Sequence, residues 1–293
     1  MQPGVWRLTS TIASVDPEQY KRTALENWQT IASGWERRRA EIEKTTRPVT
    51  EWMVRTLDPQ PGDTVLELAA GPGDTGFAAA ALLGEDGRLI SSDFSSAMVE
   101  VARRRAAELG LRNVEHRQLD AEDIPLEDDS VDGVLCRFGY MLMPDPEAAL
   151  AETRRVLRPG GRLALAVWST GRRNPWVTIA GRILVELGHA PPPEPDAPGP
   201  FVLGEDGRLQ DLLEGGGFVD VHIEEVPLLM RYDDVDDFIA ASRETSGMLA
   251  RIWADVSNAE REAIATRLAE DFAQFAVEDG YELPGVAVGA SAS

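Results

Sequence analysis

The chain of 293 residues is poor in cysteine, in histidine and in positive charge. Its single cysteine, Cys136, excludes a disulfide bond within the chain and any metal site built from several thiolates, so we expect no bound metal. Lysine and arginine together number 29 against 50 aspartates and glutamates, which gives a formal net charge of −21. Because so acidic a surface repels phosphates and anionic lipids, we expect neither nucleic acid nor a membrane as a partner.

Long apolar runs are missing as well. None reaches the ~20 residues that a membrane-spanning helix needs, and the first residues do not resemble a secretory signal peptide. We therefore expect a cytoplasmic protein, either a monomer or a homodimer. The preference for alanine, arginine, glycine and aspartate over lysine and asparagine is typical of bacterial proteins encoded by GC-rich DNA.

One stretch of the chain combines a strand, a glycine turn and a helix. The apolar residues 65–66 and 68–70 predict a short buried strand that breaks at the turn Gly71-Pro72-Gly73. Asp74 then stands where it can cap a helix, whose N-terminus would favour an anionic group. Glu67, just ahead of the turn, would be a buried carboxyl group in need of a cationic or hydroxylated partner. The G-x-G-x-x-G spacing also fits a dinucleotide site or a plain structural turn.

The apolar pattern of the first half of the chain alternates strands with helices, which predicts a doubly wound parallel sheet of the α/β class. Five strands are expected, at residues 65–70, 88–92, 114–118, 130–137 and 162–168. In the second half we expect strands at 218–225 and 283–288, with a disordered tail at 289–293.

The chain divides into four expected segments. They are an N-terminal helical cap (1–57), a ligand-binding core (58–170), a lid insertion with a proline-rich stretch (171–204), and the end of the core sheet with inserted cap helices (205–293).

Acidic residues stand at the expected ends of two further strands. Asp93 ends the second strand about twenty residues after the first glycine, where a carboxylate accepts from ribose hydroxyls. Asp120 ends the third strand, and ligands of such sheets bind at the carboxyl ends of the strands. Turn and cap chemistry is the alternative explanation for both residues.

Four motifs occur in order along the core: ELAAGPG at 67–73, DFSSAM at 93–98, DAE at 120–122, and DGV at 132–134 followed by RRVLRPGGRL at 154–163. They resemble those of the class I S-adenosylmethionine-dependent methyltransferases, in particular the small-molecule group related to ubiquinone and menaquinone biosynthesis methyltransferases. The resemblance covers roughly residues 45–230. It implies a Rossmann-like, mostly parallel seven-stranded sheet and S-adenosyl-L-methionine as the cofactor.

The resemblance also implies which residues hold the cofactor. Glu67 would lie near the amino group of the methionine portion, Asp93 would bind the ribose and Asp120 would meet the adenine amino group. Met98 would pack on the adenine ring, although a plain core role fits it equally well. The full expected set is Glu67, Ala69, Gly71, Gly73, Asp93, Phe94, Met98, Asp120, Ala121, Glu122 and Arg137.

The acceptor is expected beyond the fourth strand, where Arg137, Tyr140 and Met141 would face the methyl group. Arg137 would be a catalytic residue there, or would instead pair with a carboxylate. Tryptophans are the other candidates for walls of an acceptor pocket, although packing of the cap on the core is the simpler explanation for Trp28 and Trp35. The expected set is Trp28, Trp35, Tyr140, Met141, Trp168 and Trp176.

Methyl transfer is an in-line displacement that needs a base only when the acceptor carries a proton of high pKa. His189, beside the proline-rich stretch, is the best-placed candidate, with Tyr140 another; His116 and His222 are better explained by packing. The expected function is transfer of a methyl group to oxygen, nitrogen or carbon of a small, apolar or aromatic metabolite. An inactive cofactor-binding scaffold and an NAD-dependent oxidoreductase remain as alternatives.

Overall fold

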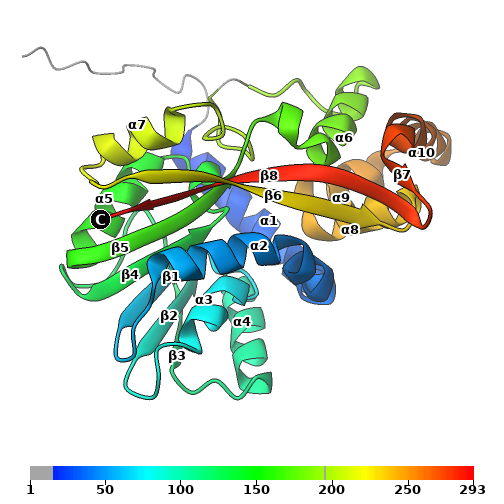
Figure 1. The fold of residues 1–293 in the computed structure, drawn as a ribbon. Coiled ribbons are helices and arrows are strands. Elements are labelled where there is room, and N and C mark those ends of the chain that lie inside the picture. The colour runs from blue at the N-terminus through cyan, green and yellow to red at the C-terminus, as the bar shows by residue number, and fades with distance from the viewer. Residues whose placement is uncertain (1–15, 195) are drawn as a thin grey trace, which may run out of the picture.

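The computed structural model of this protein describes residues 16–194 and 196–293. The expectations for the first 15 residues, including the start of the cap expected at 1–57, lie outside these ranges. The described residues form one sheet surrounded by helices (Figure 1). None of the described helices is long and apolar enough to cross a membrane.

The sheet is built from the strands β1 (Thr64–Leu68), β2 (Arg88–Asp93), β3 (Val114–Gln118), β4 (Val131–Arg137), β5 (Leu157–Trp168), β6 (His222–Tyr232), β7 (Ala276–Val277) and β8 (Gly280–Ala292). Their order is β3–β2–β1–β4–β5–β8–β6, and the short β7 pairs with β8. Neighbours among β1 to β5 are parallel, whereas β8 is antiparallel to both β5 and β6. This confirms the doubly wound, mostly parallel sheet that the sequence predicted.

The described α-helices are α1 (Pro17–Arg37), α2 (Arg39–Leu57), α3 (Asp74–Ala80), α4 (Ser96–Glu108), α5 (Pro146–Val156), α6 (Pro175–Glu186), α7 (Arg208–Gly215), α8 (Val235–Thr245), α9 (Gly247–Asp255) and α10 (Asn258–Phe272). α3 and α4 pack on β1, β2 and β3, and α2 crosses β4, β5, β6 and β8. Helix starts follow local chemistry: the Asp145 side chain accepts from the Ala148 N–H, with Pro146 in the first turn.

The centre of the sheet is apolar because helices exclude water from it. Leu66 of β1, Val134 of β4 and Leu165 of β5 have no exposed surface. Strands buried in this way read as continuous apolar runs, which is why the sequence located them well.

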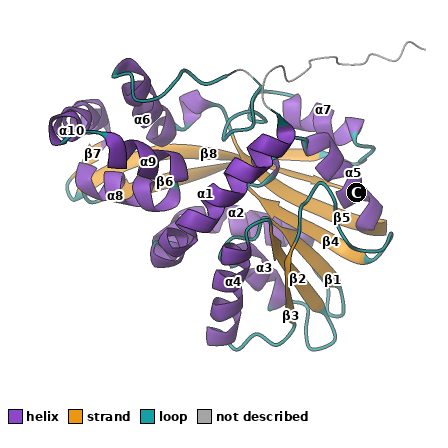
Figure 2. Ribbon diagram, turned by 180° about the vertical axis from the view of Figure 1, so that it is seen from behind, coloured by secondary structure: helices purple, strands orange, loops and turns teal. Residues whose placement is uncertain are grey.

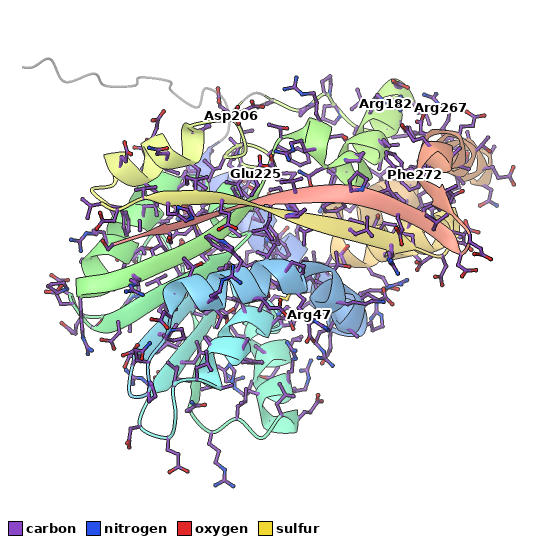
Figure 3. The ribbon with its side chains drawn as sticks, viewed as in Figure 1. Arg47, Arg182, Asp206, Glu225, Arg267 and Phe272 are labelled. Carbon is purple, nitrogen blue, oxygen red and sulfur yellow. The ribbon has the colours of Figure 1, made fainter. Side chains whose placement is uncertain are left out.

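The strands β6 and β8 form a long antiparallel pair that extends beyond the parallel core and carries the cap (Figure 1). The helices α8, α9 and α10 follow β6 in the chain and precede β8. α10 packs on α6 and α8, with Phe272 fully buried at its end. Figure 3 shows Arg182 of α6 close to Arg267 of α10, and both pair with Glu186.

The N-terminal helix α1 lies between the core and the C-terminal cap helices (Figure 2). Arg38, which connects α1 to α2, ties these parts together. Its guanidinium lies 2.9 Å from Asp237 Oδ1 and 3.2 Å from Glu244 Oε2, both on α8. The N-terminal and C-terminal segments therefore form one cap, although 199 residues separate Arg38 from Asp237 and 206 separate it from Glu244.

The end of the chain corrects the sequence-based expectation. Residues 289–293 were expected to be disordered, but β8 continues to Ala292, and Ser293 exchanges two backbone hydrogen bonds with Val219. The last strand is also longer than the expected 283–288. The glycines and alanines of this strand resemble a tail in the sequence, yet Gly289 is small because a tryptophan lies against it. A Cβ atom added to Gly289 would lie 2.6 Å from the ring of Trp52 on α2.

This contact predicts the effect of adding one methyl group to β8. Gly289→Ala should lower the free energy of unfolding by about 1–3 kcal/mol, because neither the strand nor the buried ring can move aside easily. Gly181→Ala in α6 is the matched control: an added Cβ there meets nothing within 4 Å. It should raise stability by about 0.5–1 kcal/mol through helix propensity. Urea unfolding of the two variants measures both changes, and equal stability would contradict the packing described here.

Candidate active site

The candidate site lies at the carboxyl ends of β1 and β4. From β1 the chain winds outward through β2 and β3, then returns to β4 on the other side of β1. The loops that follow β1 and β4 therefore diverge, and open α/β sheets bind ligands in the crevice between such loops. Both loops begin with a non-glycine residue in the left-handed region, Ala69 (φ 51°) and Phe138 (φ 62°). Such conformations cost of order 1–3 kcal/mol and concentrate at functional sites.

The glycine turn after β1 has one side that is filled and one that is open. Gly71 and Gly73 have φ values of 54° and 88°, which other residues rarely adopt. A Cβ atom on Gly73 would lie 2.5 Å from the ring of Phe77, whereas one on Gly71 would meet nothing within 4 Å. Gly73 is therefore required by packing, and the backbone at Gly71 is accessible to a ligand.

Glu67 lies beneath this turn with 2% of its surface exposed. Its Oε1 accepts from the Gly76 N–H at 2.7 Å, and the Ser91 hydroxyl lies 3.5 Å from Oε2. Burial raises the pKa of the Glu67 carboxyl to about 8, even though the Gly76 N–H favours the ionised form. The sequence predicted a buried carboxyl group in need of a cationic or hydroxylated partner, and the Ser91 hydroxyl lies at the long limit of a hydrogen bond.

Asp93 connects the end of β2 to the glycine turn. Its Oδ2 accepts from the Gly71 N–H and its Oδ1 from the Ser95 N–H, each at 2.9 Å. Burial raises the pKa of Asp93 to about 6, against the effect of these two hydrogen bonds. An ionised carboxylate can accept about four hydrogen bonds, so Asp93 retains capacity for ligand hydroxyls.

Asp120 and Glu122, after β3, form an ion pair with a residue that sequence reasoning missed. Lys21 Nζ lies 2.7 Å from Asp120 Oδ2 and 2.7 Å from Glu122 Oε2, so α1 passes over this end of the site. Asp120 Oδ1 also accepts from the Glu122 N–H at 3.0 Å. No sequence signal identifies Lys21, because 99 residues separate it from Asp120.

The structure brings the three predicted acidic residues to adjacent strand ends, Glu67 on β1, Asp93 on β2 and Asp120 after β3. Ala121 is buried and Phe94 half-buried in the segments beside them. The expected cofactor residues of these loops therefore follow one edge of the sheet.

Met98, Trp28 and Trp35 lie in a separate apolar cluster that packs α1 on α4. The two tryptophan rings meet edge to face at 5.8 Å, and Trp35 Nε1 donates to the Thr245 carbonyl at 3.0 Å. These tryptophans do not join Trp176, which corrects the expectation of one shared acceptor pocket. The alternative explanation, packing of the cap on the core, describes them.

A second aromatic group lies at the carboxyl ends of β4 and β5. Phe138 stacks on Trp168 with ring centroids 4.1 Å apart and planes within 8°, and Trp176 meets Trp168 edge to face at 5.1 Å. Met141 is buried next to them, and its sulfur accepts from the backbone N–H of Trp168 at 3.4 Å. The expected acceptor set included Met141, Trp168 and Trp176 but not Phe138. Its left-handed backbone cannot be recognised from the residue type.

The side chains considered for acid–base chemistry contact groups away from the carboxyl ends of the strands. The Tyr140 hydroxyl lies 2.6 Å from Thr153 Oγ1 of α5 in the core, and burial raises its pKa well above the usual range. His189 Nε2 lies 3.9 Å from Glu260 at the start of α10. His116 packs edge to face on Phe77, and burial lowers its pKa. None of these contacts directs a base toward the strand ends.

The raised pKa of Glu67 predicts a pH dependence of stability. Between about pH 4.5 and pH 8 the unfolded chain ionises at Glu67 while the folded protein keeps the proton. This residue's contribution is therefore fully present below the lower value and is lost as pH rises through the window, by about 1.4 kcal/mol per pH unit at most. Glu67→Gln removes this loss.

The stability of Glu67→Gln relative to the wild-type protein should therefore increase steadily from pH 5 to pH 8. Chemical unfolding at several pH values measures it, with Glu85→Gln in an exposed turn as the control. A difference that does not change with pH would contradict a neutral buried carboxyl group.

These features first define a class of protein. A doubly wound sheet with a glycine turn and acidic strand ends at its switch point is suited to an adenosine-containing ligand. Residues 59–180 match a family model described as a methyltransferase domain. Residues 59–180 are therefore similar to a methyltransferase domain, in agreement with the resemblance that the motifs of the core indicated.

Individual relatives agree with this assignment. Demethylmenaquinone methyltransferase of Clavibacter sepedonicus is 42% identical over 116 residues, which cover 40% of this chain and 45% of the relative. Ubiquinone/menaquinone biosynthesis C-methyltransferase UbiE of Teredinibacter turnerae is 38% identical over 111 residues, or 38% of this chain and 45% of the relative. The chain thus spans less than half the length of these relatives. The YcgJ protein of Bacillus subtilis shares the fold, with a TM-score of 0.56 and 21% identity over 83% of this chain and 96% of that protein.

Proposed function

We propose that this protein transfers a methyl group from S-adenosyl-L-methionine to a small, apolar acceptor. The observation that carries the proposal is the alignment of Glu67, Asp93 and Asp120 along adjacent strand ends around an accessible glycine turn. These donors and acceptors fit the adenosyl portion and the amino acid portion of that cofactor. The proposal further includes a cytoplasmic location and a monomeric or homodimeric state.

Each acidic side chain has a role that its hydrogen bonds permit. Asp93, held by two backbone N–H groups, would accept from the ribose hydroxyls. Asp120 would accept from the adenine amino group beside Ala121, in competition with Lys21. Glu67 would lie below the methionine portion near its cationic amino group, while Ala69, Gly71 and Gly73 allow the backbone to approach it.

When bound, the cofactor supplies an electrophilic methyl group on a sulfonium centre. Charge disappears as the displacement proceeds, so a protein that aligns the acceptor and excludes water accelerates the reaction without an acid or a base. In this proposal the helical cap keeps water away from the methyl group. The proline-rich segment contributes to it, because the Gly199 N–H donates to the Met141 carbonyl at 2.8 Å, beside the loop that follows β4.

The aromatic residues at the ends of β4 and β5 indicate the acceptor. Phe138, Trp168 and Trp176 present stacked and edge-on rings, and such surfaces favour flat apolar groups. The curated relatives named above carry names of quinone-biosynthesis methyltransferases, which is compatible with an aromatic acceptor but does not identify it.

The first test of this function is the affinity of S-adenosylhomocysteine. Asp93→Asn should weaken binding by about 10- to 100-fold, because a hydrogen bond to a charged group contributes about 1.5–3 kcal/mol. Asp132→Asn is the matched control at the other end of the sheet, where Asp132 accepts from the Thr64 N–H and pairs with Arg158. It should leave the affinity within about twofold. Isothermal titration measures both, and an unchanged affinity of Asp93→Asn would contradict the cofactor assignment.

The second test concerns the acceptor. A panel of phenols, amines and acidic carbon compounds should show release of S-adenosylhomocysteine with apolar or aromatic members. Trp176→Ala should raise the KM of such an acceptor by about 10-fold, because it removes part of the aromatic wall. Trp28→Ala, in the separate cluster of α1 and α4, should lower thermal stability and leave that KM unchanged. Methylation of small, highly charged acceptors alone would overturn the proposed acceptor class.

A further inference from the structure

The helices at the outer end of the β6–β8 pair enclose an apolar recess that shares no lining residue with the candidate active site. The recess lies between α6, α8, α9 and α10, which gather where the strand pair extends beyond the parallel core (Figure 1, Figure 2). Its volume is about 370 Å³, including the part open to solvent. All four helices contribute aliphatic side chains to its lining, among them Ala180, Leu184, Ile239, Ile252, Ile264 and Leu268.

Positive charge lies at this apolar lining. Ser242 and Arg243 of α8 add a hydroxyl and a guanidinium to it. The Arg243 guanidinium lies over the ring of Trp253 on α9, 5.7 Å from the ring centroid. The Arg261 guanidinium of α10 lies over the same ring at 5.9 Å. Two positive charges therefore meet on one tryptophan that lines the recess.

These two arginines differ in their partners from the buried arginines of the core. Arg105 of α4 pairs with Asp74, and Arg137 of β4 lies 3.4 Å from the same carboxylate. Among the residues that the structure describes, no carboxylate oxygen lies within 4.0 Å of a nitrogen of Arg243 or Arg261. The cap arginines therefore retain positive charge that no acidic side chain compensates at contact distance.

The hydrogen bonds of Arg261 are incomplete as well. Its guanidinium donates to the Trp253 carbonyl at 2.9 Å and to Asn258 Oδ1 at 3.3 Å, whereas its Nε is buried without a hydrogen-bond partner in the described part of the chain. Burial of such a donor is unfavourable. Because both guanidinium groups lie on one ring, a single anion bound at Arg243 would also lower the electrostatic energy of Arg261.

The lining and the charge together select one chemical class of ligand. Aliphatic side chains favour a hydrocarbon chain, whose burial is favourable in proportion to its apolar area. The planar guanidinium of Arg243 favours an anionic head group and matches a carboxylate in two parallel hydrogen bonds. A monoanion suits this protein better than a doubly charged phosphate ester, because a chain with a formal net charge of −21 repels the dianion more strongly.

We propose that the cap binds a small aliphatic carboxylate in this recess, with the chain between α6 and the helices α8 to α10 and the carboxylate on Arg243. Ser242 supplies a further donor beside the carboxylate, and Arg261 attracts it through its charge. The site is separate from the aromatic residues proposed for the methyl acceptor, and the inference does not rest on the proposed function.

Isothermal titration of the full chain tests the two halves of the ligand with octanoate, 1-octanol, hexanoate and acetate, all below the concentrations at which micelles form. Octanoate should bind about 10- to 100-fold more tightly than 1-octanol, which lacks the charge. Hexanoate, two methylene groups shorter, should bind about 10-fold more weakly than octanoate, and acetate should show no measurable binding. Equal affinities for octanoate and 1-octanol, or no binding of octanoate, would overturn the proposal.

Two pairs of variants locate the ligand. Arg243→Gln should weaken octanoate about 10- to 100-fold and leave 1-octanol within about twofold; Arg251→Gln, at an exposed arginine of α9 that contacts Asn27 of α1, is the matched control and should change neither. Ala180→Leu fills the recess and should weaken both ligands at least about 10-fold. Gly181→Ala, whose added Cβ meets nothing within 4 Å, should leave both unchanged.

The remaining outcomes separate this site from the proposed methyl-transfer site. Trp176→Ala should leave the affinity for octanoate within about twofold; a loss of octanoate binding in this variant but not in Arg243→Gln would move the ligand to the acceptor region and overturn the inference. Octyl phosphate that binds more tightly than octanoate would contradict the carboxylate. Protein that binds octanoate as expected but not S-adenosylhomocysteine would contradict the proposed function and leave this inference in place.

Discussion

The chain leaves the neighbouring parallel strands β1 and β4 toward opposite edges of the sheet, and the rest of the site depends on this constraint. Their loops must diverge, and open α/β sheets bind ligands between such loops. The base of this region is closely packed: a Cβ atom on Gly139 would lie 2.8 Å from that of Ala69 and 2.6 Å from Cys136 Sγ. A Cβ atom on Gly71, by contrast, would meet nothing within 4 Å.

The acidic groups of the candidate site differ in how deeply they are buried. The deepest carboxyl group, Glu67, accepts a hydrogen bond from the N-terminus of α3, and burial raises its pKa to about 8. A cation placed above it would lower this pKa and favour the ionised form. The acidic groups nearer the surface, Asp93 and Asp120, are held by backbone N–H groups and keep free lone pairs. Such an arrangement favours a ligand that is polar along one edge and cationic at its centre.

The cap consists mainly of helices that lie outside the residues matched by the methyltransferase family model. The family match covers residues 59–180, so α1, α2 and the helices carried between β6 and β8 lie outside it. The cap nevertheless contacts the site at Lys21 and Thr46, and Arg38 joins its two halves. Folds of this type carry many functions, and specificity resides in the segments added to them. In the proposed function, acceptor specificity would be shared between these added segments and the aromatic residues at the ends of β4 and β5.

The core sheet, the glycine turn and the acidic strand ends could be predicted from the residues alone, because these features follow from local patterns. Apolar runs, glycine breaks and capping residues act over a few positions and leave a readable period. Three features could not be predicted in this way: Trp52 requires glycine at position 289, Lys21 pairs with Asp120, and Trp28 and Trp176 lie in different clusters. These contacts join residues far apart in the chain, and packing between helices sets them without a signal in either local sequence.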